Sequence, residues 1–329
     1  IQERFEKCFD KKHFWKGQQM ASNLEYRKPQ KTGQKRRNRE TRQAYLFLTP
    51  ALIIIIIFFV AAIAFALFMS FNKVNMFSQQ FRFTGFKNYL NAFSDKVAFK
   101  ALSNTALFSF VVVPLQTLIA LVIAYGLSSH AVKFKKTFRL IYFLPTLTSS
   151  AALTLIFMFI FNVAGPLNNF FMSIGFYNKP INFLQNPAYS LKVIMVMNIW
   201  STVPTYMTIY LASLVDLPES FYEAAEMDGA TSWDKLRYIT VPYLRPITIY
   251  VLLTGIIGTF QMFDQAFIFS NGSGGPNNST LTLALMIYNY AFGSLNTMGY
   301  ACALAILLTI IIFAVSRLAE KINGGNGLQ

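Results

Sequence analysis

Long apolar segments alternate with polar connections along most of this chain. Six of these segments are about as long as the ~20 helical residues that cross a hydrocarbon core of ~30 Å. They cover residues 45–71, 104–127, 138–161, 191–214, 246–269 and 298–318. The pattern predicts an all-α integral membrane protein with six transmembrane helices.

The six segments differ in how polar they are. The first contains an unbroken run of isoleucine from Ile53 to Ile57, and we expect it to face lipid. The later segments carry helix-interrupting or small residues, namely Pro114, Pro145, Pro204, Gly255 and Gly258. Because freed backbone polar groups must find partners inside a membrane, we expect these helices to pack on protein or to line a cavity.

Positive charge is concentrated before the first apolar segment. The chain has 29 Lys and Arg against 14 Asp and Glu, a formal net charge of +15, and 13 of the basic residues lie in the first 42 positions. A basic arm next to a span favours the cytoplasmic side of a membrane over nucleic-acid binding. We therefore predict a cytoplasmic arm at 1–44, a membrane domain at 45–320 and a tail at 321–329, with both termini in the cytoplasm.

The connection at residues 216–245 is unusually acidic. It holds six of the 14 acidic residues of the chain, all between Asp216 and Asp234. The sequence predicts a helix over 218–228, with Pro218 in its first turn and Gly229 ending it at a positive φ. An ordinary solvated hairpin between two spans would show the same features, so this alternative stays open.

A second short helix is predicted directly after Gly229. Thr231 and Asp234 have the spacing of a capping box, in which an Asp replaces the usual Glu. Apolar residues then recur at helical spacing, at Trp233, Leu236 and Ile239. Pro242 is predicted to close this helix before the next span, so that the connection forms a compact pair of helices with a glycine between them.

The same connection carries a sequence motif. Glu223-Ala224-Ala225 is followed by Gly229, then by Ile239 and Pro242. This resembles the EAA signature of binding-protein-dependent ABC importer permeases, E-A-A-x3-G-x9-I-x-L-P, with Val241 in place of the Leu. Residues 45–320 as a whole resemble the maltose- and glycerol-phosphate-type permease subunits of carbohydrate uptake systems.

Further parts of the chain carry this resemblance. They are Leu144-Pro145, Asn198-x-Trp200-x3-Pro204, Gly274-Gly275-Pro276, Tyr288-x2-Ala291-Phe292 and Gly299-Tyr300-Ala301-x-Ala303-Leu304. The arm at 1–44 lies outside it.

The resemblance implies a function, a location and partners. The motif would form a cytoplasmic coupling helix that docks on a separate ATPase. Its coupling residues are Glu223, Ala224, Ala225, Gly229 and Ala230. The chain would be a non-catalytic permease subunit of the bacterial cytoplasmic (inner) membrane, in contact with lipid and with no cofactor or nucleic acid of its own. A second, non-identical permease subunit, an ATPase dimer that binds ATP and Mg, and an extracytoplasmic solute-binding protein would complete the assembly.

The resemblance also implies a polar solute pathway among the third to fifth spans. The positions that it assigns to this pathway are Thr146, Ser150, Asn198, Trp200, Ser201, Thr202 and Asp264. Trp200 could instead pack between helices, and the hydroxyl and amide groups could instead join helices by hydrogen bonds. Asp264, as an ionisable residue in a span, is expected to face water or a partner.

Other functions lack the residues that they require. The sequence has no G-x4-G-K-[ST] loop for nucleotide phosphates, and its two Cys and two His are too scattered for a metal site or a catalytic set. The main alternative is a secondary carrier or channel for a polar solute, which needs charged groups within its spans. A membrane enzyme is a weaker alternative. The sequence leaves the solute open among an oligosaccharide, a monosaccharide and glycerol-phosphate.

Overall fold

The computed structural model describes residues 32–75, 80–128, 135–293 and 297–322. Most of the predicted arm and tail therefore lie outside the described residues. The chain divides into two compact units, residues 1–64 and 65–329. The predicted boundary between the arm and the membrane domain, at residue 44, stays a prediction.

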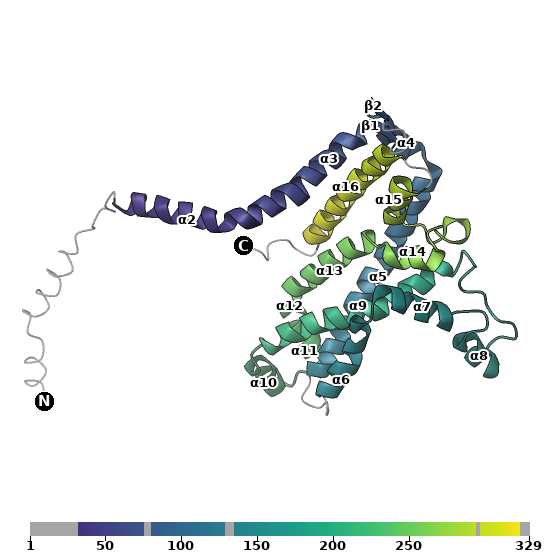
Figure 1. Cartoon of the computed structure of the whole chain (residues 1–329). Helices are drawn as coiled ribbons and strands as arrows, with labels where there is room; N and C mark the ends of the chain where they lie inside the picture. The colour runs from purple at the N-terminus through teal and green to yellow at the C-terminus, as the bar shows by residue number, and fades with distance from the viewer. Residues whose placement is uncertain (1–31, 76–79, 129–134, 294–296, 323–329) are drawn as a thin grey trace, which may run out of the picture. The chain divides into compact units, whose positions relative to one another are not determined.

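The described part of the first unit is one continuous helix. α2 (Thr32–Ile55) passes through a π-helical turn, η3 (Ile56–Val60), into α3 (Ala61–Ser70), which continues into the second unit (Figure 1). Residues Glu40–Ser70 are long and apolar enough to cross a membrane. Apolar side chains surround this helix on all sides, as suits contact with lipid. The predicted first span is therefore a helix.

A β-hairpin that the sequence pattern did not predict follows α3. β1 (Asn72–Asn75) pairs antiparallel with β2 (Gln80–Phe83), and the register sets Lys73 opposite Arg82. α4 (Lys87–Ser94) comes next, and its Asn88 Nδ2 donates hydrogen bonds to the carbonyls of Ser70 at 2.8 Å and Asn72 at 3.0 Å. These two bonds fix α4 against the end of α3 and the start of the hairpin.

The longest helix of the second unit, α5 (Lys96–Ser128), lies at the centre of this unit and contacts several other helices. α9 (Ser190–Val215) and α13 (Arg245–Phe260) both lie along α5 (Figure 1). Two clusters of buried side chains result, one including Phe108, Val112, Ile194 and Met197, the other including Ala120, Met207 and Tyr210. Thr259 Oγ1 of α13 also donates to Ser109 Oγ of α5 at 2.8 Å.

The C-terminal helices also pack on α5 and α13. α15 (Leu283–Phe292) packs on α16 (Met298–Ile322), and α16 also contacts α13. Asn104 Nδ2 of α5 donates to the carbonyls of Asn278, in the short helix η6 (Pro276–Asn278), and of Leu281. These long-range bonds hold the loop before α15 against α5.

The predicted third span is not a straight helix, which corrects the sequence expectation. α6 (Lys135–Phe143) leads into a 3-10 turn, η4 (Leu144–Leu147), and then into α7 (Ser150–Ile160). The two arms are bent by 105°. Pro145 cannot continue an α-helix because it lacks an N–H. Ser149 then starts α7 by accepting a hydrogen bond from the Ala152 amide at 3.2 Å. α8 (Pro166–Ser173) follows.

The predicted fifth span is also interrupted. α13 ends at Phe260, and α14 (Asp264–Ser270) starts after three intervening residues. Asp264 therefore lies in the first turn of a new helix rather than inside a continuous one, and it is exposed. A carboxylate is stabilised at this position because a helix N-terminus carries partial positive charge.

Four helices in the described ranges are long and apolar enough to cross a membrane. They are Glu40–Ser70, Lys96–Ser128, Arg245–Ser270 and Met298–Ile322, and the bent pair of α6 and α7 raises the number to five. The predicted fourth span is a single helix, α9, but it is not among these candidates because its polar residues lower its mean hydropathy. The fold is thus mostly helical with four or five candidate spans, and the number of six stays a prediction.

The proline and glycine residues of the predicted spans were expected to pack against other helices, and only some of them do. Pro145 and Pro204 are buried, and a Cβ added to Gly255 would lie 2.9 Å from Gln116 Nε2 of α5. Pro114 and Gly258 are instead exposed in this chain.

Candidate functional site

The acidic connection (residues 216–245) folds as a pair of short helices, and we call it the coupling hairpin after the role that the sequence resemblance predicts for it. α10 (Ser220–Met227) is followed by α11 (Ser232–Lys235), a π-helical turn η5 (Leu236–Thr240) and α12 (Val241–Tyr243). Two boundaries differ slightly from the predicted ones. Pro218 precedes α10, where its carbonyl accepts from the Phe221 amide, and Pro242 lies inside α12, which ends one residue later.

The turn between α10 and α11 is a Schellman motif. Gly229 has a φ of 77°, as predicted, and its amide donates to the Glu226 carbonyl at 3.0 Å. The Ala230 amide donates to the Ala225 carbonyl at 2.9 Å. This pair of bonds satisfies the last carbonyls of α10 and requires a residue with positive φ at position 229. Ala225, Gly229 and Ala230 therefore shape the turn.

A capping box starts α11, and this prediction is confirmed. The Asp234 amide donates to Thr231 Oγ1 at 3.3 Å, and the Thr231 amide donates to Asp234 Oδ2 at 2.9 Å. Hydrogen bonds from the Thr231 hydroxyl and then from the Thr231 amide hold the pKa of Asp234 below its ordinary value. The stabilisation that the ionised Asp234 carboxylate gives to the cap is thus fully present above about pH 4 and is lost as the pH falls through this lowered pKa.

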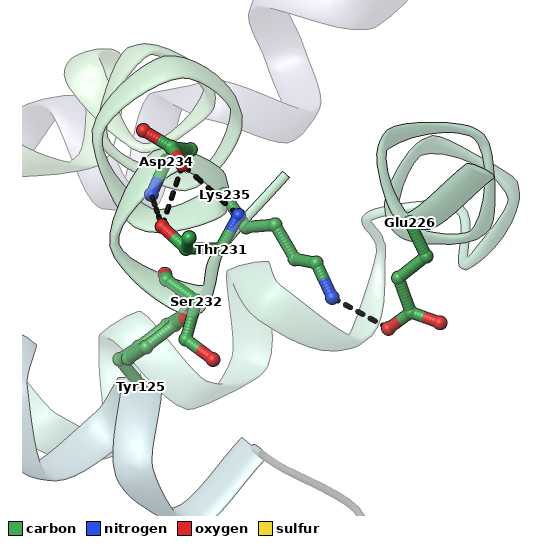
Figure 2. A network of polar contacts seen from close by, with 6 residues as sticks. All are labelled: Tyr125, Glu226, Thr231, Ser232, Asp234 and Lys235. Carbon is green, nitrogen blue, oxygen red and sulfur yellow. Dashed lines mark hydrogen bonds and ion pairs between the residues drawn. The ribbon is translucent and has the colours of Figure 1, made fainter. Parts of the chain in front are cut away.

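Three further contacts hold the coupling hairpin in place, and the residues of the first and third are drawn in Figure 2. Lys235 Nζ forms an ion pair with Glu226 Oε1 at 2.5 Å, which ties α11 to α10. Tyr222 Oη and Thr240 Oγ1 are hydrogen-bonded at 2.8 Å. Tyr125 Oη, near the end of α5, donates to the Ser232 carbonyl at 3.0 Å. The hairpin is therefore hydrogen-bonded directly to α5, the helix at the centre of the core.

The surface of the coupling hairpin that faces away from the rest of the chain is exposed and could contact a partner. Glu223 and Ala224 are exposed, and Met227 is 89% exposed. Of the predicted apolar stripe, Leu236 and Ile239 are half-buried, whereas Trp233 is 65% exposed. Exposed large apolar side chains beside carboxylates are typical of a surface that another protein covers.

Replacing Thr231 by alanine should loosen α11 without disturbing the membrane helices. Loss of an N-cap hydroxyl costs about 1 kcal/mol, so we expect amide hydrogen exchange over residues 232–240 to become about fivefold faster. Thr231→Ser keeps the hydroxyl and should exchange like the wild type. Equal exchange in the alanine variant and the wild type would show that the cap does not hold the hairpin.

Three of the predicted pathway residues, Asn198, Trp200 and Ser201, lie on one stretch of α9 that contacts α7 and α14. Asn198 Nδ2 of α9 donates to Gln265 Oε1 of α14 at 3.0 Å, and Ser201 Oγ donates to the Asn198 carbonyl. The Trp200 ring, 49% exposed, lies 5.8 Å from the Phe157 ring of α7. Parts of the third, fourth and fifth predicted spans, α7, α9 and α14, thus contact one another here, and we call Asn198, Trp200, Ser201 and Gln265 the Asn198 cluster.

Other predicted pathway residues are not bonded into this cluster. Thr146 Oγ1 donates to the Phe143 carbonyl at the bend between α6 and α7, whereas the Ser150 carbonyl accepts from Thr154 Oγ1 within α7. Thr202 is half-buried on α9. The sequence reasoning missed Gln265, although its position next to Asp264 in a predicted span was a usable signal. Within the described residues, no group of His, Cys, Asp and Glu could hold a metal ion.

Comparison with known proteins points in one direction. Residues 116–323 match the family described as binding-protein-dependent transport system inner membrane component. The chain is 33% identical to the lactose transport system permease protein LacF of Rhizobium radiobacter, over 83% of this chain and 91% of that protein. It is 32% identical to the arabinooligosaccharides transport system permease protein AraP of Bacillus subtilis, over 85% and 88% respectively.

Solved structures share the fold. A chain of a bacterial ABC transporter involved in the import of the acidic polysaccharide alginate superposes with a TM-score of 0.75, at 19% identity, over 88% of this chain and 97% of that one. A chain of a bacterial alginate ABC transporter in complex with an alginate pentasaccharide-bound periplasmic protein gives a TM-score of 0.74, at 19% identity, over 90% of this chain and 98% of that one.

Proposed function

Because the chain belongs to the family of binding-protein-dependent transport system inner membrane components, we propose that it forms one half of the translocation pathway of an ATP-driven importer for a carbohydrate. The observation that carries this proposal is similarity over more than four-fifths of the chain to permeases named for lactose and arabinooligosaccharides. An oligosaccharide or a related polar solute suits the amide, hydroxyl and indole groups of the Asn198 cluster.

The proposed assembly contains several further proteins. A second, non-identical permease subunit completes the pathway, and an extracytoplasmic binding protein delivers the solute. ATP and Mg bind to a separate ATPase dimer, so this chain is not itself an enzyme. The protein spans the bacterial cytoplasmic membrane several times, with both termini and the coupling hairpin in the cytoplasm. The excess of basic residues before the first span supports this orientation.

In this proposal the coupling hairpin is the part that the ATPase moves. Glu223 and Ala224 offer the contact surface, while Ala225, Gly229 and Ala230 set the turn that presents it. The ion pair of Lys235 with Glu226 and the bond from Tyr125 to Ser232 make the hairpin move with α5 rather than bend by itself. Closure of the ATPase dimer would then shift α5, α9 and α13 as one packed group.

The solute pathway is proposed to include the Asn198 cluster and Thr202. The half-exposed Trp200 offers an aromatic face to the apolar side of a sugar ring. The Asn198 and Gln265 amides retain donors and acceptors beyond the bond that joins them. Thr146, Ser150 and Asp264 would line neighbouring parts of the same path.

Reconstitution tests the proposed function directly. The chain is co-expressed with its partner subunits, placed in liposomes and supplied with the binding protein and a panel of labelled sugars. We expect uptake that requires ATP and the binding protein. Uptake that proceeds without the ATPase and is driven by an ion gradient would establish a secondary carrier instead.

Replacing Trp200 by alanine should weaken handling of the solute while leaving the ATPase intact. Loss of an aromatic face worth about 1 kcal/mol predicts a KM for uptake about fivefold higher, with basal ATP hydrolysis unchanged. Trp200→Phe keeps an aromatic face and should lie close to the wild type. If alanine leaves KM unchanged, Trp200 packs on Phe157 and has no part in the pathway.

A further inference from the structure

A pocket of about 740 Å³ lies where the β1–β2 hairpin meets α4, α15 and the start of α16. None of its lining residues belongs to the coupling hairpin or to the Asn198 cluster. The charged residues that line it are three cations, Lys73, Arg82 and Lys87, and one acid, Asp95. The pocket therefore has an excess of positive charge.

The three cations have no carboxylate partner in the part of the chain that the structure describes. Asp95 is committed to other groups, because its Oδ2 accepts from Tyr300 Oη at 2.9 Å and its Oδ1 accepts from the Val97 amide at 2.8 Å. The acid thus ties α16 to the start of α5 and is engaged by neutral donors.

The strand register brings two of these cations together. Lys73 lies directly opposite Arg82 in the antiparallel pair, an arrangement that destabilises a hairpin because the charges repel. Another polar group of the pocket is also unsatisfied, since the buried Thr297 Oγ1 has no hydrogen-bond partner among the described residues. A ligand that carries anionic oxygens would relieve the repulsion and would supply an acceptor.

The strands β1 and β2 and the helix α4, whose residues line the pocket, lie at the opposite end of the second unit from α10 and α11 of the coupling hairpin (Figure 1). Asp95 directly precedes α5, whereas Tyr125, near the other end of α5, contacts the coupling hairpin. Thirty helical residues span about 45 Å, which exceeds a hydrocarbon core of about 30 Å. With the coupling hairpin in the cytoplasm, the pocket faces the outside of the membrane.

We propose that this pocket is a docking site for acidic side chains on the surface of the extracytoplasmic binding protein. The proposal rests on the proposed function, which requires such a protein to deliver solute at this face. Arg82 can bind a carboxylate through two parallel hydrogen bonds. Phe83, which also lines the pocket and is 75% exposed, adds an apolar contact, and aromatic and arginine residues are enriched in protein interfaces.

The test uses the complete transporter in nanodiscs and the binding protein purified from the same host. Lys73, Arg82 and Lys87 are replaced together by glutamine. We expect association with the binding protein to become about tenfold slower at low salt, and the difference to disappear as the salt approaches 1 M, because charged interface residues steer encounter. Basal ATP hydrolysis should not change.

A matched triple variant controls for loss of charge as such. Lys96, Lys100 and Lys192 lie at the starts of α5 and α9, are exposed and do not line the pocket. Their replacement by glutamine should leave association at the wild-type rate. Equal slowing by both triple variants would show a general charge effect and would overturn the docking site.

Two other outcomes also decide the matter. If the wild-type assembly binds the protein and the pocket variant binds it equally fast at every salt concentration, the docking site is wrong and the proposed function stands. If the wild-type assembly binds no such protein, the proposed function itself fails. The pocket variant is also compared with the wild type in nanodiscs of two compositions. If the variant associates with the binding protein more slowly in nanodiscs that contain phosphatidylglycerol but at the wild-type rate in phosphatidylcholine alone, the pocket binds a lipid headgroup and the docking site is wrong.

Discussion

Replacing Gly229 by valine should reduce solute-stimulated ATP hydrolysis and uptake about tenfold or more, with the ATPase still attached. The reason is the backbone, because a φ of 77° lies in the left-handed region, which costs an ordinary residue about 1–2 kcal/mol and a β-branched residue more. The Schellman turn would open and present α10 at a different angle. A rigid coupling element that is held at a different angle no longer fits the ATPase. ATP hydrolysis and the movement of the membrane helices would then become uncoupled.

Asparagine at the same position separates backbone strain from a direct clash. Asn tolerates the left-handed conformation better than other side chains with a Cβ, and no atom of the described residues lies within 4 Å of a Cβ added at Gly229. Gly229→Asn should therefore retain much of the coupled activity. If asparagine is as damaging as valine, the surface around position 229 is itself in contact with the ATPase. If valine has full activity, the turn has no coupling role.

Replacing Gly299 by alanine should destabilise the outer end of the membrane domain severely. A Cβ at this position would overlap the carbonyl oxygen of Asn72 and would also crowd the Met69 carbonyl. The Asn72 carbonyl cannot move freely because Asn88 donates a hydrogen bond to it. Forced overpacking of this kind costs about 3 kcal/mol, so we expect a melting temperature several degrees lower and a reduced yield of assembled transporter.

Gly126 supplies the matched control for this prediction. It also lies in a helix, α5, but a Cβ added there meets no atom of the residues that the structure describes within 4 Å. Gly126→Ala should leave the melting temperature unchanged or raise it slightly, since alanine favours a helix by up to about 1 kcal/mol. A Gly299→Ala protein as stable as Gly126→Ala would mean that α16 does not pack closely against β1.

The coupling hairpin could be predicted in detail because local chemistry determines it. The capping box of Thr231 with Asp234 and the left-handed Gly229 depend on neighbours within six residues, which a sequence displays directly. The boundaries at Pro218 and Pro242 were displaced by one or two residues. Such displacement is expected, since helix ends depend on a few weak bonds.

The rest of the site depends on contacts that a single sequence does not reveal. The bond between Asn198 and Gln265 joins residues 67 positions apart, and the pairing of Lys73 with Arg82 depends on a hairpin too short to show a clear alternating pattern. The bend after Phe143 and the break before Asp264 were also missed, because uninterrupted hydropathy hides where a helix turns. Pro145 marked the first of these positions without determining the angle.

The central claim is that the coupling hairpin of this permease subunit is gripped by the ATPase, and cross-linking of the intact assembly tests it most directly. A single cysteine replaces the exposed Ala224 in a chain whose Cys8 and Cys302 are serine, and a second one at Lys100 serves as the control near the other end of α5. We predict that Ala224→Cys cross-links to the ATPase and is protected from a water-soluble maleimide, while Lys100→Cys does neither. Rapid labelling of Ala224→Cys in the intact assembly, with no cross-link to any other subunit, would contradict the account.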